Sequence, residues 1–319
     1  MLERLMPKAL HYVEAVAQQG SVQKASRELH ISASAVIRQI ALLEKELHVV
    51  LFERHAHGMR ITPAGQMFVD MARDWQRQIE QVWSKVKEMQ GESFGHLRLA
   101  TMDSLVNGVL PVFLDRLASQ YPKVIIGVDV VSPDDAVEAL RQGAADIALA
   151  FNITQQRDLK SIWNADLPLG GVVAREHELA RKEFIMFADL VRYPIAAQNE
   201  TLSIRRYLDS HHKWLFSDRE PPLATNSLQL VKQMALRGTH VALTSEIDAA
   251  PEILDGALVF RPIRDKGAVA QSICTAVYPH RVLPRVAWAV AELLSETTQV
   301  MLNNVRRSQG EHFETILDG

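Results

Sequence analysis

One stretch near the N-terminus, SVQKASRELHISASAVIRQIALLEKEL at residues 21–47, carries side chains suited to reading nucleic acid. Arg38 can donate two parallel hydrogen bonds to a guanine edge or bind a phosphate, and Ile37 beside it can contact a thymine methyl group. The small residues Ala33 and Ser34 let a helix that carries them enter a DNA groove. The stretch therefore predicts a recognition helix with Arg38 near the bases.

The spacing of apolar residues predicts three short helices that position this stretch. The first ends at Gly20, the second follows the potential N-cap Ser21, and the third follows Ser32, another N-cap. Their inward positions are Leu10, Val13 and Val16, then Val22, Ala25 and Leu29, then Val36, Ile40, Leu43 and Leu47. Helices joined in this way form a helix-turn-helix. The alternative is a plain three-helix packing domain, in which Arg38 is a solvated charge and Ile37 belongs to the core.

The next segment, VVLFERHAHGMRITPAG, predicts a strand, a turn at residues 55–58, a return strand and a new helix. Thr62 can cap that helix and Pro63 suits its first position. These elements complete a winged helix-turn-helix, whose wing meets the sugar-phosphate backbone. The predicted DNA contacts are Ser21, Ser32, Ala33, Ser34, Ile37, Arg38, Arg54, His55 and Arg60. His55 and His57 are spaced like metal ligands, but no acidic or cysteine partner stands at matching spacing, so no metal site is expected.

A long helix should follow the wing and pair with a second copy of itself. Apolar residues recur at steps of four and three over about three heptads, which is typical of a helix seam. The seam positions are Phe68, Ala72, Trp75, Ile79, Val82, Val86 and Met89. A dimer built on this seam presents two recognition helices about one DNA turn, roughly 34 Å, apart. The alternative is a single helix that packs on its own domain.

Two glycines in GESFGH, at residues 91–96, predict a domain boundary after the long helix.

Composition limits the classes of protein that this chain can be. Its 319 residues, 47% apolar and 23% charged, can bury the cores of two or three domains. The net charge is -3, whereas residues 1–62 hold eight Lys or Arg against six Asp or Glu, so a weakly basic N-terminal part precedes an acidic remainder. The single cysteine, Cys274, excludes an internal disulfide and a two-thiol switch, and predicts a reducing, cytoplasmic location. No signal-peptide core and no run of about 18 apolar residues is present, so neither secretion nor membrane spanning is expected.

Residues 8–68 resemble the DNA-binding domain of LysR-type transcriptional regulators, and the resemblance extends more loosely through the rest of the chain. The motifs that carry it are Ala17, Gly20 and Ser21, then Ser34, Ala35, Arg38, Gln39 and Ile40, then Leu43 and Glu44, then Leu51, Phe52 and Arg54, then Thr62, Ala64 and Gly65. Three positions depart from the family pattern: Ala33 replaces Gln, Ile37 replaces Ser or Asn, and His48 replaces Gly. Because Ala33 and Ile37 lie on the reading face, the operator sequence cannot be carried over.

The resemblance implies a cytoplasmic transcription regulator and not an enzyme. Such a protein binds an interrupted dyad in double-stranded DNA as a homodimer, and two dimers associate into a homotetramer. It contacts RNA polymerase, does not associate with membranes and needs no cofactor. Its activity is controlled by a small-molecule effector, whose identity the resemblance leaves open.

The rest of the chain predicts an α/β domain with a mostly parallel sheet, because short β-rich runs alternate with helical patterns. The strands HLRLATM, KVIIGVDVV and ADIALAF alternate with helices at 105–120 and 133–142, and further strands near 169–175, 193–198, 240–245 and 258–263 alternate with helices at 202–213 and 226–237. QSICTAVY at 271–278 should return to the first lobe. Two lobes joined by two crossovers resemble a type 2 periplasmic-binding-protein fold, as the family implies.

The expected organisation therefore has four parts. An N-terminal all-α winged helix-turn-helix occupies residues 1–62 and a long linker helix residues 63–92. A C-terminal α/β two-lobed domain occupies residues 93–303, and a polar tail residues 304–319. Lobe I is expected at 95–162 and 268–303, and lobe II at 163–267.

Ligands in open α/β sheets bind at the carboxyl ends of strands, beside helix N-termini. This rule selects Thr101, Met102, Asp103, Ser104, Ser132, Phe151, Asn152, Gln198, Thr201, Thr225 and Asn226 as effector contacts. Ser104 and Thr201 resemble positions at which family members hold an effector through hydroxyls. Helix capping is an equal alternative for Asp103, Ser104, Thr201 and Asn226. Asp103 and Glu200 would repel a carboxylate effector.

Three rival functions lack the features that they require. An enzyme needs a catalytic motif, and the sequence has no nucleophile elbow, P-loop, Gly-x-Gly-x-x-Gly or His-Glu-x-x-His, which leaves only the scattered His177, His211, His212 and Asp146. A regulator fused to a biotin-repressor-like ligase needs a nucleotide-binding loop, and none is visible. A solute-binding protein needs export and has no use for residues 1–90.

Overall fold

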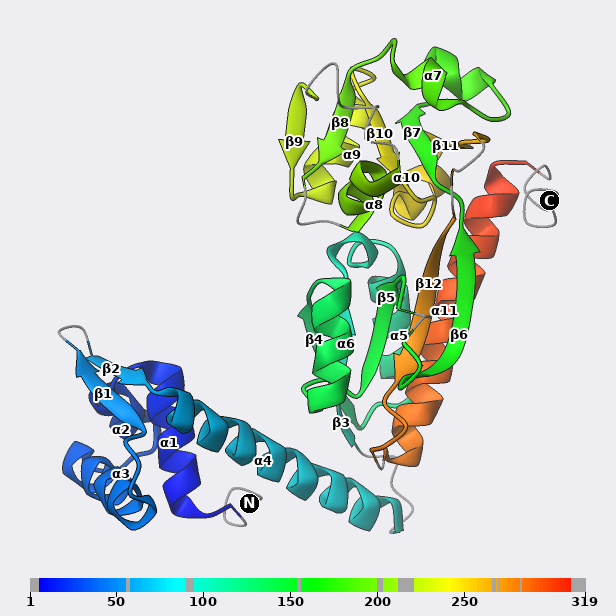
Figure 1. Cartoon of the computed structure of the whole chain (residues 1–319). Coiled ribbons are helices and arrows are strands. Elements are labelled where there is room, and N and C mark those ends of the chain that lie inside the picture. The colour runs from blue at the N-terminus through cyan, green and yellow to red at the C-terminus, as the bar shows by residue number, and fades with distance from the viewer. Residues whose placement is uncertain are drawn as a thin grey trace. The chain divides into compact units, whose positions relative to one another are not determined.

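The computed structural model of the chain describes residues 6–55, 58–89, 95–153, 156–199, 203–211, 221–265, 268, 270–281 and 283–310. The chain forms two compact units, at residues 1–92 and 93–319 (Figure 1). None of the helices in these described ranges is long and apolar enough to cross a membrane.

The N-terminal unit is the predicted winged helix-turn-helix followed by a long helix. Its elements are α1 (Lys8–Gln19), α2 (Val22–Glu28), α3 (Ala33–Leu47), β1 (Phe52–His55), β2 (Gly58–Ile61) and α4 (Pro63–Met89) (Figure 1). Two predicted helix ends are confirmed. Gly20 closes α1 with a φ of 60°, and the hydroxyl of Ser32 accepts a hydrogen bond from the Ala35 amide at 3.2 Å. Val16, Val36 and Leu51 are fully buried in the shared core.

Two predictions about side chains in this unit are wrong. Leu47 is 38% exposed because it lies in the last turn of α3, beyond the buried positions Val36 and Ile40. Ala33 is half-buried against the core, and its predicted contact with DNA stays a prediction. Ser21 stands at the N-cap of α2, but its side chain makes no capping hydrogen bond.

Thr62 and Gly65, two residues of the motif quoted above, hold the start of α4 against the wing. Thr62 Oγ1 accepts from the amide of Gly65 at 3.0 Å and donates to the carbonyl of Val50 at 2.8 Å. A Cβ at Gly65 would lie 2.3 Å from the carbonyl oxygen of Leu51, closer than any real contact. Only glycine fits there, which explains the spacing of Thr62 and Gly65.

The end of α3 is strained at His48. This residue adopts a left-handed φ of 54°, a region that glycine enters freely and that costs other residues about 1 kcal/mol. The glycine usual in the family at this position would therefore be better suited to the backbone than the histidine of this chain.

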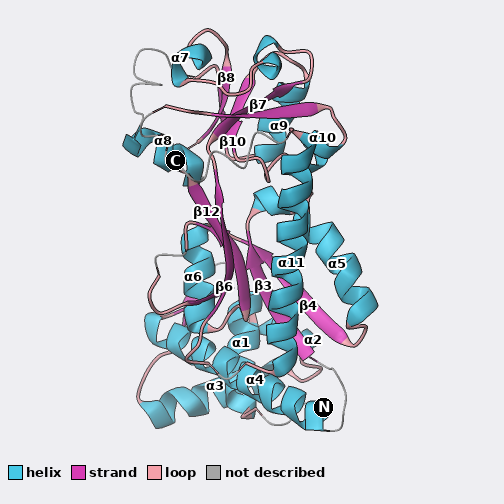
Figure 2. Ribbon diagram, turned by 90° about the vertical axis from the view of Figure 1, so that its right-hand side faces the viewer, coloured by secondary structure: helices cyan, strands magenta, loops and turns pink. Residues whose placement is uncertain are grey.

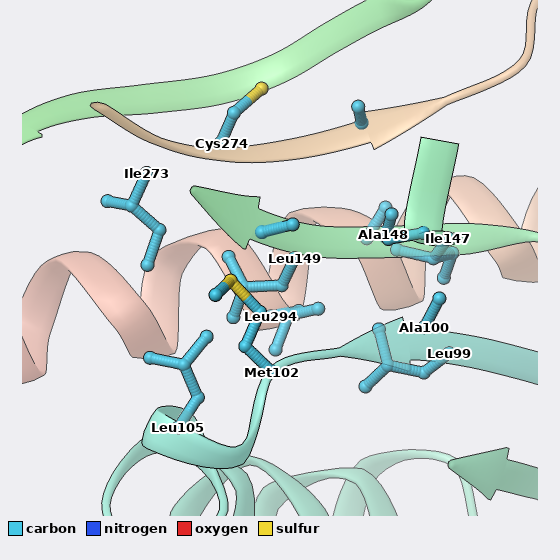
Figure 3. Packing of buried hydrophobic residues seen from close by; sticks show 14 of the residues in the cluster. Leu99, Ala100, Met102, Leu105, Ile147, Ala148, Leu149, Ile273, Cys274 and Leu294 are labelled. Atoms are coloured by element: carbon cyan, nitrogen blue, oxygen red, sulfur yellow. The ribbon is translucent and has the colours of Figure 1, made fainter. Parts of the chain in front are cut away.

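Lobe I of the second unit is a five-stranded sheet in the order β4-β3-β5-β12-β6. Its elements are β3 (Gly95–Thr101), η2 (Asp103–Leu105), α5 (Val109–Gln120), β4 (Val124–Val130), α6 (Pro133–Gln142), β5 (Ile147–Phe151), β6 (Lys160–Leu167), β12 (Gln271–Val277) and α11 (Arg285–Ser308). Figure 3 shows its core, where Leu99 of β3, Leu149 of β5 and Leu294 of α11 pack together.

Lobe II is a second five-stranded sheet, in the order β11-β7-β10-β8-β9. Its elements are β7 (Gly170–Ala174), η3 (Glu178–Arg181), α7 (Phe187–Leu190), β8 (Ile195–Gln198), α8 (Ser203–His211), β9 (Leu223–Thr225), α9 (Leu228–Leu236), β10 (Val241–Thr244), α10 (Ala250–Leu254) and β11 (Leu258–Pro262). Alternate strand residues join two different core clusters, as Val173 and Val172 do, so both faces of the sheet are covered.

The two-lobed α/β architecture is confirmed, but the prediction of a mostly parallel sheet is wrong. β3 pairs in parallel with β4 and β5, whereas β12 pairs antiparallel with β5 and β6. In lobe II, β8 pairs in parallel with β9 and β10, whereas β7 pairs antiparallel with β10 and β11. The cause is connectivity. The antiparallel strands β6, β7, β11 and β12 carry the chain between the lobes, so no helical crossover sets their direction.

The lobe boundaries lie later in the chain than predicted. β6 continues to Leu167, beyond the expected end of the segment at residue 162, and β12 begins at Gln271. α11 continues to Ser308, past the expected boundary at residue 303, because Val305 is fully buried against lobe II. The remainder of the expected tail, from residue 311, lies outside the described residues.

α11 packs on both lobes, as Figure 2 shows. Near its end, Arg306 donates to the carbonyl of Asp166 in β6 at 2.7 Å and pairs with Glu246, which follows β10, at 2.7 Å. Glu246 is fully buried. Burial raises the pKa of Glu246, and the opposing effect of Arg306 does not cancel that rise. The pair thus joins α11 to both lobes across a buried charge.

Replacing Arg306 with alanine should lower the free energy of unfolding by about 3 kcal/mol, because Glu246 would then be buried without its cation. Loss of the cation raises the folded-state pKa of Glu246 further. The loss of stability should therefore be largest at high pH, where Glu246 must stay charged, and should shrink as falling pH protonates it. Denaturant unfolding across a pH range measures both effects.

The neighbouring exposed residue provides the control for this prediction. Arg307→Ala removes the same charge from the same helix turn and should change stability by less than about 0.5 kcal/mol. Equal losses in the two variants, or a loss that grows as the pH falls, would contradict the role given to Arg306.

Candidate nucleic-acid interface and interlobe cavity

The outward face of α3 presents the central residues of the predicted DNA contact. Ile37 is 44% exposed, and Ser34 and Arg38 are also exposed. Ser32 Oγ lies 3.1 Å from Ser34 Oγ, so the first turn of the helix is ordered by its own side chains. In the described part of the chain, Arg38 has no hydrogen-bond or ion-pair partner. Its guanidinium can therefore bind a ligand outside the protein.

The wing places two of its predicted contacts on the surface. His55 is exposed at the end of β1, and Arg60 donates across the hairpin to Glu53 at 2.9 Å. Both members of this pair are more than half exposed, so the pair contributes less than about 1 kcal/mol and a phosphate can compete for Arg60. The side chain of Arg54 and residues 56–57 lie outside the described residues.

Glu44 joins α3 to the wing, a role that the predicted contacts did not include. Its Oε1 accepts from the backbone amides of Leu51 at 2.7 Å and Phe52 at 3.2 Å. Both of these residues are buried, so their amides need an acceptor from the protein. The only sequence signal was the family motif at Leu43 and Glu44. The sequence alone does not explain that motif, because the hydrogen bonds join Glu44 to amides that lie beyond the end of its own helix.

α4 divides the predicted dimer seam between two surfaces. Ala72 is fully buried against α1, and Phe68 and Ile79 are partly buried in the same cluster. These three residues pack within the chain, as the alternative of a helix packed on its own domain requires. Trp75, Val82 and Val86 of the seam are exposed, and the side chain of Met89 lies outside the described residues. With Met67 and Met71, these three are the exposed apolar positions among the described side chains of α4. They recur at helical spacing and form an exposed stripe along α4.

A cavity of about 400 Å³ lies between the two lobes of the second unit. Seven of the predicted effector contacts line it: Met102, Asp103, Ser104, Ser132, Phe151, Gln198 and Asn226. They come from the carboxyl ends of β3, β4, β5, β8 and β9, as the rule for open α/β sheets requires.

Three other predicted effector contacts do not line the cavity. Thr101 is buried and donates to the carbonyl of Leu149 at 3.1 Å, and Thr225 accepts from the amide of Ser227 at 3.1 Å. Asn152 accepts from the amide of Ser272 at 3.0 Å. Each of these side chains has a local structural role. Thr201 lies outside the described residues.

The capping alternative has a mixed outcome. Ser132 lines the cavity and also caps α6 by accepting from the amide of Asp135 at 3.2 Å. Asn226 caps no helix, because Ser227 caps α9. Ser104 Oγ is buried without a hydrogen-bond partner in the described structure, so its hydroxyl is not used as a cap.

Sequence reasoning missed half of the lining. The additional residues are Val130, Val131, Pro133, Asp135, Leu228, Asp248 and Gln271. Asp248 follows β10, so the strand-end rule would have found it had the rule been applied to that strand. Gln271 opens the strand that returns from lobe II, and no sequence signal marks it.

Three of the remaining residues with catalytic or redox potential, Asp146, His177 and Cys274, have structural roles. Asp146 accepts from the amide of Arg98 at 2.9 Å, and His177 caps η3, where burial lowers its pKa. Burial also raises the pKa of the Cys274 thiol, which contacts Ser161 at 3.3 Å, so its reactive thiolate form is disfavoured. His211 ends α8, and His212 lies outside the described residues. No group of three or more potential metal ligands occurs in the described ranges.

Comparison with protein families matches both units. A family described as "Bacterial regulatory helix-turn-helix protein, lysR family" matches residues 7–66, and "LysR substrate binding domain" matches residues 90–299. Among curated relatives, the regulator CysB of Haemophilus influenzae is 30% identical over 60% of this chain and 59% of its own length. ClcR of Pseudomonas putida is 35% identical over 53% of this chain and 58% of its own length. These two matches span less than two thirds of the relatives.

Longer matches have lower identity. OxyR of Escherichia coli is 22% identical over 97% of both chains. Among solved structures, full-length CbnR complexed with its target DNA has a TM-score of 0.64 at 19% identity, over 94% of this chain and 99% of that one. OxyR of Corynebacterium glutamicum has a TM-score of 0.57 at 19% identity, over 94% and 95%. These structures confirm the fold.

Replacing Glu44 with alanine should destabilise the N-terminal unit by about 2 kcal/mol, because two buried amides lose their acceptor. Glu46→Ala is the matched control, since Glu46 is an exposed acid on the same helix and should cost little. Thermal unfolding of the two purified variants compares them. If Glu44→Ala were as stable as Glu46→Ala, the attachment of the wing to α3 would not depend on this carboxylate.

Proposed function

This chain belongs to the LysR family of bacterial transcriptional regulators, and from that premise we propose that it binds specific DNA sites under the control of a small molecule held between its two lobes. One observation carries the proposal. The same chain combines an exposed, locally capped helix in a winged helix-turn-helix with a cavity of about 400 Å³ between two α/β lobes. The function is argued from these two sites, because a fold by itself hosts many functions.

The DNA contact is centred on α3. Arg38 is the residue that reads a base or a phosphate, because it is exposed on the N-terminal half of the helix and has no described partner within the chain. Ile37, exposed beside it, suits a thymine methyl group. Arg60 and His55 on the wing bind the sugar-phosphate backbone and set the register of the helix.

The exposed stripe of α4 is the surface on which two copies pair. Val82 is 62% exposed and Trp75 43% exposed, an unusual position for large apolar side chains unless a partner covers them. Pairing along α4 yields a homodimer that binds an interrupted dyad. Association of two dimers into a homotetramer, and contact with RNA polymerase, are further parts of the proposal that rest on the family resemblance. The protein acts in the cytoplasm, where its DNA is.

The effector acts by binding one arrangement of the lobes more tightly than another. Ser104 in lobe I and Asp248 in lobe II both line the cavity, and each has a buried oxygen without a hydrogen-bond donor. A ligand that bonds to both oxygens favours one separation of the lobes. Only such a difference in affinity between two states allows a ligand to change the behaviour of a regulator.

The peroxide response of a relative is not extended to this chain. One relative from Escherichia coli is named "Hydrogen peroxide-inducible genes activator", and it is 22% identical to this chain. A thiol sensor requires an accessible thiolate and often a second cysteine. The single cysteine of this chain is buried with a raised pKa, so ligand binding is the better-supported form of control.

The proposal is tested by incubating the purified full-length protein with fragments of its host's genomic DNA, at a stated salt concentration, and sequencing the bound fragments. An enriched dyad motif is the expected result, and the neighbouring genes then indicate the regulated process. Binding without sequence preference would contradict the assignment of α3 as a reading helix.

Arg38→Ala should weaken binding to the enriched site by about tenfold to a hundredfold, because a bidentate contact to a base is worth about 1–3 kcal/mol. Arg38→Lys keeps the charge but loses the planar fork, so it should recover only part of the affinity. Fluorescence anisotropy with a labelled operator measures these constants. Unchanged affinity and specificity in Arg38→Ala would remove Arg38 from the interface.

Val82→Asp should weaken dimerisation by at least about tenfold, because a charge would be placed in an apolar contact. Val82 is mostly exposed in the single chain, so folding should be preserved. Gln76→Asp introduces the same charge at an exposed position on another face of α4 and serves as the control. Analytical ultracentrifugation measures the oligomer. A dimer that persists unchanged in Val82→Asp would show that this stripe is not the contact surface.

A further inference from the structure

The cavity between the lobes has an acidic lining. Asp103 and Asp135 are exposed at its lobe I side, and Asp248 on the lobe II side is only 4% exposed. Among the described residues that line the cavity, none is lysine, arginine or histidine. The described lining therefore contains three carboxylates and no cationic side chain.

Among the described residues, Arg205 approaches the lining from outside and is already paired with an acid. Arg205 donates to the backbone carbonyl of Gln198 at 3.5 Å, but its Nε binds both carboxylate oxygens of Asp209, at 2.8 and 2.9 Å. A guanidinium paired in this way contributes little positive potential to the cavity. It does not offset the three carboxylates.

Asp248 presents an acceptor that the protein does not use. Its Oδ2 accepts from the hydroxyl of Thr244 and from the amide and hydroxyl of Ser245, at 3.1 and 2.8 Å for the latter two. Its Oδ1 is buried and accepts no hydrogen bond in the described structure. Ser104 Oγ is likewise buried without a partner. Buried polar atoms without partners are uncommon and costly, so these two oxygens suit a ligand that supplies donors.

The helix N-termini at the cavity do not favour a carboxylate ligand. The first turn of α6 contains Asp134 and Asp135, whose negative charges offset the positive potential of the helix N-terminus. The amide of Asp135 is also occupied by Ser132 Oγ. At α9, the hydroxyl of Ser227 already accepts from the amide of Leu230 at 3.3 Å. At each of these two helix ends, one first-turn amide is therefore already occupied by a side chain of the protein.

We infer that the effector of this cavity is a small protonated amine and not a carboxylate. The inference rests on the proposed function, because it names the chemical class of the ligand that the same cavity binds. The ammonium group donates hydrogen bonds to Asp248 Oδ1 and Ser104 Oγ, and Asp103 and Asp135 add attraction at longer range. A quaternary ammonium has no donor and would leave both oxygens unpaired.

The shape of the cavity limits the rest of the ligand. Its volume of about 400 Å³ lies near the lower end of small-molecule sites, which measure about 300–1,000 Å³. Phe151 and Leu228 are buried and line it, so they offer an apolar wall to the hydrocarbon part of the ligand. A compact alkylamine or arylalkylamine meets both conditions.

The inference is tested by isothermal titration calorimetry of the full-length protein with two matched series. One series is phenethylamine, phenethyl alcohol and phenylacetate, and the other is putrescine, butanediol and succinate. In at least one series, the amine should bind about tenfold or more tightly than its neutral and anionic counterparts, because it makes charge-assisted hydrogen bonds. Tighter binding of the carboxylates, or no detectable binding of either amine, would overturn the inference.

Two variants and a control place the amine at Asp248. Asp248→Asn removes the charge but keeps the shape and an acceptor for Ser245, and it should lower amine affinity about tenfold. Ser104→Ala, a smaller change, should lower it as well and serves if Asp248→Asn disturbs the turn. Asp115→Asn removes an exposed acid of lobe I outside the cavity and should have no effect. Amine binding that is unaffected by both cavity variants would overturn the site.

DNA binding separates this inference from the proposed function. If a carboxylate and not an amine changes occupancy of the enriched DNA site, the amine is overturned and the regulator is supported. If an amine binds as described while the protein selects no DNA sequence, the proposed regulator fails and the ligand class is supported.

Discussion

The packing of α11 on both lobes is the constraint on which the ligand-binding unit depends. Leu294 of this helix lies in the core of lobe I, Val305 packs on lobe II, and Arg306 binds groups of both. A cavity between two lobes keeps its shape only while their separation is held. The distance between polar atoms of the two lobes, such as those of Ser104 and Asp248, is therefore set in part by the packing of α11. A small change in that packing changes the separation of the lobes, and a ligand that binds one separation more tightly favours it.

The N-terminal unit is held together by a few specific contacts because its core is small. Glu44 attaches the wing to α3, and Thr62 attaches the start of α4 to the wing. Gly65 has no side chain, so the backbone of α4 can approach the carbonyl of Leu51 closely. These contacts orient the wing and the recognition helix relative to each other. Backbone contacts on the wing can set the register of Arg38 only if that orientation is rigid.

The parts of the fold that follow from local chemistry could be predicted from the sequence. Caps at Gly20, Ser32 and Thr62 and the period of the apolar residues located the winged helix-turn-helix, and strand ends located half of the cavity lining. Two errors, at Ser21 and Leu47, are local, whereas the larger errors arose where contacts are distant in sequence. Ala72 fitted a heptad seam equally well whether it met α1 or a second copy, and the antiparallel pairing of β12 depends on where the chain returns.

The place of β12 in its sheet has a consequence for synthesis of the protein. β12 lies between β5 and β6, yet the ribosome makes it after the whole of lobe II. Lobe II is continuous in sequence and can complete its sheet first, whereas β5 and β6 must wait with unpaired backbone edges. Contacts of such long sequence separation form slowly. A nascent chain that stalls before residue 271 would therefore expose two strand edges in lobe I, and these edges are the places where aggregation or chaperone binding would begin.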